Sequence, residues 1–141
     1  MFLDAAYVTK YYLNEPDSPA VRKVIASADS LTISALTIVE YATAARRHLR
    51  KGKLTVSQFQ KAIEEFRIDV ENGTWTIAPV TETLFWRTAG QLAGLPPGVL
   101  LRAGDAIQLL SARESGEHEI WTNDHHLLAA APHVGLTGRS A

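Results

Sequence analysis

The sequence contains no cysteine, and this absence excludes disulfide frameworks, thiolate nucleophiles and Cys-ligated zinc or iron–sulfur centres. It also lacks any apolar run near the roughly 20 residues that a helix needs to cross a bilayer. The N-terminal segment MFLDAAYVTKYY has neither the basic start nor the long apolar stretch of a signal peptide. We therefore expect a soluble, cytoplasmic protein that does not associate with a membrane.

Acidic residues are missing from one stretch of the chain, between Tyr41 and Ile63, which carries six positive charges. The formal net charge of the whole chain is −1, so the remainder holds −7. One interpretation is a solvated helix end whose cations complement the helix dipole. A compatible one is a patch that contacts phosphates and gives salt-sensitive affinity for nucleic acid. The candidate residues are Arg46, Arg47, Arg50, Lys51 and Lys53, together with Arg102, for which a plain surface role is equally open.

Strand and helix signals alternate along the 141 residues, with no linker, repeat or low-complexity segment between them. With 46% hydrophobic residues, the chain is long enough to bury one core, and we expect a single domain over residues 1–141. The alternation favours an α/β fold with a central, largely parallel sheet. The expected strands are 2–3, 31–33, 75–80, 119–122 and 134–137, and the expected helices are 6–13, 18–28, 36–51, 57–72, 83–93, 101–115 and 125–130.

Some side chains are expected to fix the helix ends and the core. Ser57 and Gln60 are spaced as a capping box for the helix over 57–72. The helix over 83–93 is expected to bury the apolar residues Leu84, Trp86, Ala89 and Leu92.

Four acidic residues, Asp4, Glu40, Asp105 and Asp124, lie where an expected strand has just ended or an expected helix is beginning. Each has a structural alternative. Asp4 and Asp124 are spaced as helix N-caps, and Glu40 follows Thr37 with the spacing of a capping box. Asp105 lies in the segment LRAGDAIQLL, whose apolar neighbours argue against a purely surface position.

The common position of these acids favours one shared site. Ligands in open α/β sheets collect outside the carboxyl ends of the strands, and helix N-termini there favour anions. Carboxylates gathered in one cleft repel one another unless a cation binds between them. Carboxylate and water oxygens are the ligands that Mg²⁺ and Mn²⁺ prefer, and such ions activate water against phosphodiesters. The pattern therefore predicts a metal site.

Four segments carry a resemblance to a known family: FLDAAYVTKYYLNE, ISALTIVEYATA around Glu40, LRAGDAIQLLSA around Asp105, and IWTNDHHLLAAA around Asp124. In this order they resemble the PIN-domain ribonucleases, and more narrowly the VapC-type toxins of bacterial toxin–antitoxin pairs. The resemblance implies a three-layer α/β/α fold and an acidic site for Mg²⁺ or Mn²⁺. It also implies endonucleolytic cleavage of RNA, a homodimer, and inhibition by a VapB-type antitoxin.

One position departs from the family pattern. The family usually carries Ser or Thr two residues after the first aspartate, where this chain has Ala6. The alternative function is accordingly a catalytically weak or silent PIN-like module that binds RNA or a protein. A phospho-accepting receiver domain is disfavoured, because the paired acids after the first strand and a lysine beyond Lys61 are missing.

Our working hypothesis is that Asp4 and Asp105 bind the principal cation, while Glu40 and Asp124 complete the shell or orient the attacking water. Thr122 and Asn123 are expected to be hydrogen-bonding neighbours. His125 and His126 are adjacent, so on a helix they point about 100° apart and are not expected to ligate one ion together. The three tryptophans are expected in the core or at a dimer interface, and the sequence does not decide whether Tyr7, Tyr11 and Tyr12 face a partner.

Overall fold

Five short parallel strands form the sheet, in the order β3-β2-β1-β4-β5. The computed structural model describes residues 1–141. The strands are β1 (Phe2–Leu3), β2 (Thr32–Ser34), β3 (Thr76–Ala78), β4 (Glu119–Trp121) and β5 (Thr137–Arg139). The helices are α1 (Ala5–Tyr12), α2 (Ser18–Ala26), α3 (Leu36–Arg50), α4 (Val56–Glu71), α5 (Glu82–Gly94), α6 (Ala103–Glu114) and α7 (His125–Ala130), and a 3-10 helix, η1, spans Ala131–Val134.

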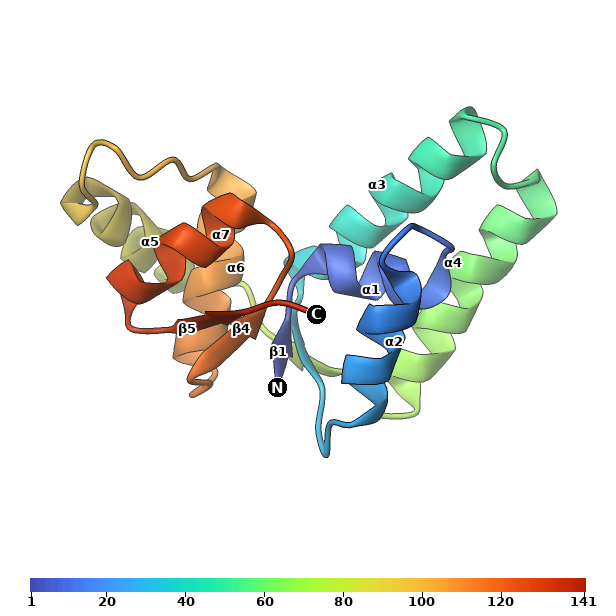
Figure 1. Cartoon of the computed structure of the whole chain (residues 1–141), viewed down its shortest axis with the longest axis horizontal. Helices are drawn as coiled ribbons and strands as arrows, with labels where there is room; N and C mark the ends of the chain where they lie inside the picture. Colours follow the sequence, from blue (N-terminus) through green and yellow to red (C-terminus); the bar gives the residue numbers. More distant parts are fainter.

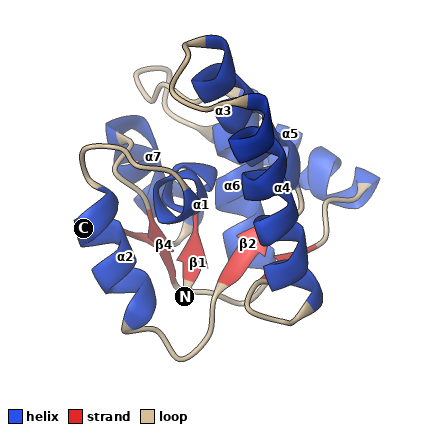
Figure 2. Cartoon of the chain, turned by 90° about the vertical axis from the view of Figure 1, so that its right-hand side faces the viewer, coloured by secondary structure: helices blue, strands red, loops and turns tan.

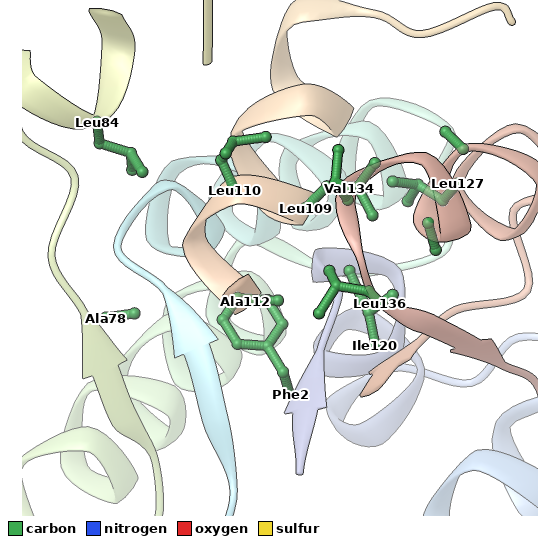
Figure 3. Close-up of a cluster of buried hydrophobic side chains, with 12 residues drawn as sticks. Phe2, Ala78, Leu84, Leu109, Leu110, Ala112, Ile120, Leu127, Val134 and Leu136 are labelled. Carbon is green, nitrogen blue, oxygen red and sulfur yellow. The ribbon is translucent and has the colours of Figure 1, made fainter. Parts of the chain in front are cut away.

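Two apolar cores lie on opposite faces of the sheet, because successive strand residues point to opposite sides. Phe2 packs with α5, α6, α7 and η1, whereas its neighbour Leu3 packs with α1 to α4. The two groups of helices lie on the left and the right of the molecule in Figure 1. Figure 3 shows the first core, in which Phe2, Leu109 and Ile120 come from three different elements. The predicted three-layer α/β/α fold with a parallel sheet is confirmed.

An aromatic cluster forms part of the second core. The Tyr12 ring packs against Tyr41, Phe66 and Trp75, and its hydroxyl accepts a hydrogen bond from Trp75 Nε1 at 2.8 Å. Tyr11 packs edge-on against Trp75. Tyr7 is fully buried in the second core, and Tyr11 and Tyr12 pack against this core as half-buried residues. Figure 2 shows α1 to α4 in front of the strands.

Helix α5 was predicted with too broad an apolar face. Leu84 is buried, but Trp86 is 72% exposed, and Ala89 and Leu92 are exposed as well. The buried face consists of Leu84 and Thr88, one turn apart, because α5 packs mainly against α6 and has only this narrow side to bury. The Thr88 hydroxyl is compatible with burial because it donates to the Leu84 carbonyl.

Two further expectations were wrong. The capping box of α4 is formed by Thr55 and Gln58, two residues before the predicted pair, since Thr55 is the residue in the extended conformation that an N-cap needs. The last strand begins at Thr137, because residues 131–134 form η1 and Gly135 ends it with a φ of +80°. Strand β5 is a mostly exposed edge strand, so its sequence carries no apolar pattern. No helix is long and apolar enough to cross a membrane.

The position of the capping box can be tested by comparing two substitutions. We expect Thr55→Ala to lower the free energy of unfolding by about 1 kcal/mol, because it removes the acceptor for the Gln58 N–H. Ser57→Ala should change it by less than about 0.5 kcal/mol, because Ser57 is exposed within the helix. Urea unfolding of both variants measures the difference. A larger loss for Ser57→Ala would contradict the assignment.

Candidate active site

The candidate site lies where the sheet changes its winding direction. From β1 the chain moves to β2 and β3 on one side, while β4 and β5 lie on the other, so the turning point falls between β1 and β4. Asp4 directly follows β1, and Asp124 follows β4 after two residues. Ligand sites of doubly wound sheets form at such a point, beyond the carboxyl ends of the strands. Figure 2 shows α1 continuing from the end of β1.

One cavity of about 460 Å³ is lined by all four predicted acids. Asp4 and Asp124 reach it from the ends of β1 and β4, Glu40 from the second turn of α3, and Asp105 from the first turn of α6. The fold thus brings together four residues that are spread over 121 positions of the sequence. Ala6, Arg47 and Gln108 also line this cavity.

Asp4 is the most buried acid, with 4% of its surface exposed. Its Oδ1 accepts a hydrogen bond from the Tyr7 N–H at 3.0 Å, so Asp4 is the N-cap of α1. Its Oδ2 accepts a hydrogen bond from the Thr122 hydroxyl. The pKa of Asp4 is raised from 3.8 to about 6, mainly by burial and also by the charge of Glu40, while the hydrogen bonds from Thr122 and Tyr7 oppose this rise. The N-cap role and the site role therefore coexist.

Glu40 does not form the capping box that its spacing suggested. The N-cap of α3 is Ala35, without a side-chain cap, and the Leu36 N–H donates instead to the Ser34 hydroxyl. The Glu40 carboxylate accepts a hydrogen bond from Gln108 Nε2 at 2.6 Å. Burial raises the pKa of Glu40, and the charge of Asp105 adds to this rise. The Glu40 side chain therefore lines the cavity and does not cap the helix.

Asp105 and Asp124 form the other side of the acidic cavity. Burial raises the pKa of Asp105, the charge of Asp124 raises it further, and the positive fields of Arg102 and His126 lower it. Asp124 caps α7, because its Oδ1 accepts from the N–H groups of His126 at 2.7 Å and Leu127 at 3.3 Å. Its Oδ2 accepts no hydrogen bond from the protein.

The acids interact as a row of neighbours rather than as a closed cage. The charge of Glu40 raises the pKa of Asp4, the charge of Asp105 raises the pKa of Glu40, and the charge of Asp124 raises the pKa of Asp105. No three Asp, Glu or His side chains are close enough to enclose an ion by themselves. Four carboxylates that repel one another around a polar cavity nevertheless suit a hard cation that keeps part of its water shell, as Mg²⁺ does.

The predicted hydrogen-bonding neighbours have different roles. Thr122 is fully buried, donates to Asp4, and accepts from the Asp124 N–H at 3.0 Å, so it ties two of the acids together. Asn123 accepts from the Tyr7 hydroxyl at 2.8 Å. The rings of His125 and His126 lie 4.0 Å apart by centroid, and they do not join the acids in a metal-binding group.

The predicted basic residues lie at one end of α3 and in the turn that follows. Arg46, Arg47, Arg50, Lys51 and Lys53 are all exposed, and none forms an ion pair. Arg47 differs from the others because it also lines the acidic cavity. Arg102, exposed before the first turn of α6, lies apart from this group but close enough to Asp105 to affect its pKa.

Gln108 is the one functional candidate that the sequence analysis missed. It lies three residues after Asp105, so both side chains are on the same face of α6. That spacing was the available signal, but a lone glutamine among apolar residues carries no recognisable motif. The contact with Glu40 becomes visible only in three dimensions.

The buried charge of Asp4 is expected to make the stability of the protein depend on pH. Its pKa is 3.8 when exposed and about 6 in the folded protein, so ionisation opposes folding. This contribution is absent below pH 3.8, grows between pH 3.8 and 6, and is complete above pH 6. We expect Asp4→Asn, which preserves the N-cap, to stabilise the metal-free protein at pH 7.5 by about 1–3 kcal/mol, and by less at pH 5.

Urea unfolding in EDTA at the two pH values measures this difference. Asp29→Asn, at an exposed position outside the cavity, controls for the loss of one negative charge. Equal destabilisation by Asp4→Asn at both pH values would show that the buried charge of Asp4 does not oppose folding.

A family model of the PIN domain matches residues 1–132 of the chain. No curated protein sequence matches the chain significantly. Among solved structures, the chain is similar to Mycobacterium tuberculosis VapC20, described as a toxin that cleaves the sarcin–ricin loop, with 15% identity and a TM-score of 0.71 over 92% of this chain and 93% of that one. It is also similar to VapBC2 from Rickettsia felis bound to a promoter DNA fragment, with 14% identity and a TM-score of 0.66 over 99% of this chain and 98% of that one.

A toxin–antitoxin complex from Klebsiella pneumoniae is a third similar structure, with 16% identity and a TM-score of 0.65 over 94% of this chain and 92% of that one. At such identities these structures show a shared fold. The family match, in contrast, spans nearly the whole sequence and includes all four acids of the cavity. The chain therefore belongs to the PIN domain family.

Proposed function

We propose that this protein is a metal-dependent endoribonuclease of the VapC type, which acts as a toxin by hydrolysing RNA phosphodiester bonds. The observation that carries the proposal is the cavity at the turning point of the sheet, where four carboxylates from four separate segments meet. A similar fold belongs to a toxin that cleaves the sarcin–ricin loop, and this supports RNA as the substrate class. In this proposal residues 1–141 act as a single PIN-like nuclease domain.

Asp4 and Asp105 are the proposed principal ligands of Mg²⁺ or Mn²⁺, with Glu40 and Asp124 beside them. A bound divalent cation lowers the pKa of a coordinated water and stabilises charge on the phosphate in the transition state. Because no three acids enclose an ion by themselves, an ion held by these residues would keep part of its water shell. Thr122 fixes the Asp4 carboxylate, and Asp124 keeps Oδ2 available to hold or orient water.

Arg47 connects the acidic cavity with the basic surface, which consists of the exposed cations at the end of α3 and in the following turn. It is exposed, has no acidic partner, and is the one Lys or Arg in the lining of the cavity. An arginine in this position suits one phosphate of a bound RNA while the carboxylates and their cation face the scissile one. The remaining cations of α3 and the following turn then contact phosphates along the strand.

A catalytically weak or silent module that binds RNA or a protein is the alternative. Ala6 supports it, because this residue lines the cavity and brings a methyl group where the family usually has a hydroxyl. The four carboxylates favour the enzymatic function more strongly. A surface that only binds RNA would be weakened by carboxylates, because they repel phosphates. Turnover of RNA separates the two functions.

The partners in this proposal follow from the family. We propose a homodimer in the cytoplasm that is inhibited by a VapB-type antitoxin. Two of the similar structures are described as a toxin–antitoxin complex and as VapBC2, and this supports an antitoxin as a partner.

Metal-dependent cleavage is the direct test of the function. We expect the protein to cut RNA with Mg²⁺ or Mn²⁺ and to stop in EDTA. Asp4→Asn and Asp105→Asn should each lower the rate about 100-fold or more, because several kcal/mol of transition-state stabilisation are lost. Asp29→Asn makes the same chemical change on the exposed surface and should leave the rate unchanged.

The outcomes distinguish the two candidate functions. Sequencing of RNA ends after brief induction in cells, with Asp4→Asn as the control, identifies the cut sites. Mutants as active as the wild type would disprove the site. A wild type that binds RNA without cutting it under any metal would favour the binding module.

The basic surface is tested by the salt dependence of RNA binding. In an Asp105→Asn background, which keeps the RNA intact, Arg46→Gln with Arg50→Gln should weaken binding and reduce the slope of log K against log salt by about 1.4 for single-stranded RNA. The matched control is Arg87→Gln with Arg139→Gln, because these arginines are paired with Glu114 and Glu119 on other elements. An equal change in slope for the control pair would refute a specific role of the basic surface in binding RNA.

A further inference from the structure

Gln108 links the two helices that carry Glu40 and Asp105. Its side chain is 2% exposed, and its Nε2 donates to Glu40 Oε2 at 2.6 Å and to Thr37 Oγ1 at 3.0 Å. Thr37 and Glu40 are three residues apart on α3, so one amide group joins α6 to one face of α3.

The orientation of this amide is unusual for a buried glutamine. Its Oε1 is the only buried side-chain polar atom without a hydrogen-bond partner. Turning the amide over would offer Oε1 to the Thr37 hydroxyl, but it would also place Oε1 against the Glu40 carboxylate. The donor therefore faces the acid, and an unsatisfied carbonyl is left behind. Such groups are rare in native structures and call for a role beyond packing.

The other carboxylate oxygen of Glu40 rests on the same helix. A Cβ atom added to Gly104 would lie 3.0 Å from Glu40 Oε1, closer than an ordinary contact. The absence of a side chain at Gly104 thus leaves the space that Glu40 occupies, while Gln108 supplies the hydrogen bond. Both positions flank Asp105 along α6.

We propose that Gln108, together with the space at Gly104, is a positioning device that holds Glu40 against α6 beside Asp105. A lysine or arginine in place of Gln108 would hold Glu40 equally well but would neutralise its charge. The neutral amide fixes the carboxylate and leaves its full charge for a cation. The inference rests on the proposed metal-dependent function, and it concerns positioning rather than direct contact with the substrate.

Two variants probe the device from opposite sides. Gln108→Met keeps the approximate shape and removes the donor. Gly104→Ala crowds Glu40 Oε1 while favouring the helix, so the melting temperature should be kept or raised. We expect each to weaken Mn²⁺ binding about 10-fold in calorimetry without RNA. Ser111→Ala, which removes another buried polar group of α6 that pairs with Ser34, should leave Mn²⁺ affinity unchanged.

A double-variant cycle with Glu40→Gln separates positioning from general damage. If Gln108 acts through Glu40, Gln108→Met should cost little further Mn²⁺ affinity in the Glu40→Gln background. Additive losses, or wild-type affinity in both Gln108→Met and Gly104→Ala, would overturn the inference.

Crystal structures of the metal-free wild type and Gln108→Met keep the inference testable without metal. We expect the Glu40 carboxylate to leave its place on α6 in the variant, and an unmoved carboxylate would overturn the positioning role. A wild type that neither binds Mn²⁺ nor cuts RNA, but whose Glu40 moves in Gln108→Met, would overturn the proposed function and leave the positioning role standing.

Discussion

Mutual repulsion among carboxylates is the constraint on which the cavity of this protein depends. Burial already disfavours the charge on Asp4, and each of Asp4, Glu40 and Asp105 is further disfavoured by a neighbouring acid. Side chains under such repulsion would turn apart if they were held by their own torsions alone. The protein counters this with fixed hydrogen-bond donors, which are the backbone N–H groups of two helix N-termini, the Thr122 hydroxyl and the Gln108 amide.

All these donors are neutral, and this choice has a chemical consequence. A charged partner would satisfy each acid permanently and remove the driving force for binding a cation. Neutral donors orient the carboxylates and leave the repulsion in place, so that the divalent cation proposed for this site would relieve it on binding. The parallel sheet makes the arrangement possible, because it delivers strand ends and helix N-termini to the same edge on both sides of the turning point.

The sequence predicted the sheet, its parallel sense and the order of the elements, because alternating apolar strands and helices have local signatures. Prediction from the sequence failed where tertiary packing decides which residues are buried. Strand β5 is an exposed edge, so it has no apolar pattern, and Trp86 is exposed because α5 buries only a narrow face. Glu40 looked like half of a capping box, yet its partner Gln108 is 68 residues away. Local spacing identified the acids and the N-cap positions of Asp4 and Asp124, and Thr122 was expected beside them. Gln108, which holds Glu40 from a distant segment, was not predictable from local patterns.

Charge separation along the chain takes on a physical meaning in the fold. The acids are drawn from both halves of the sequence into one cavity, while five of the six cations of the acid-free stretch remain on the surface at the end of α3 and in the turn that follows. A nucleic acid would be repelled by the cavity alone and would bind the basic surface without being cut. Arg47 belongs to both, because the axis of α3 extends from Glu40 at the cavity to the basic turn. The helix thus fixes the distance between the surface proposed to bind a phosphate backbone and the site proposed to hydrolyse it.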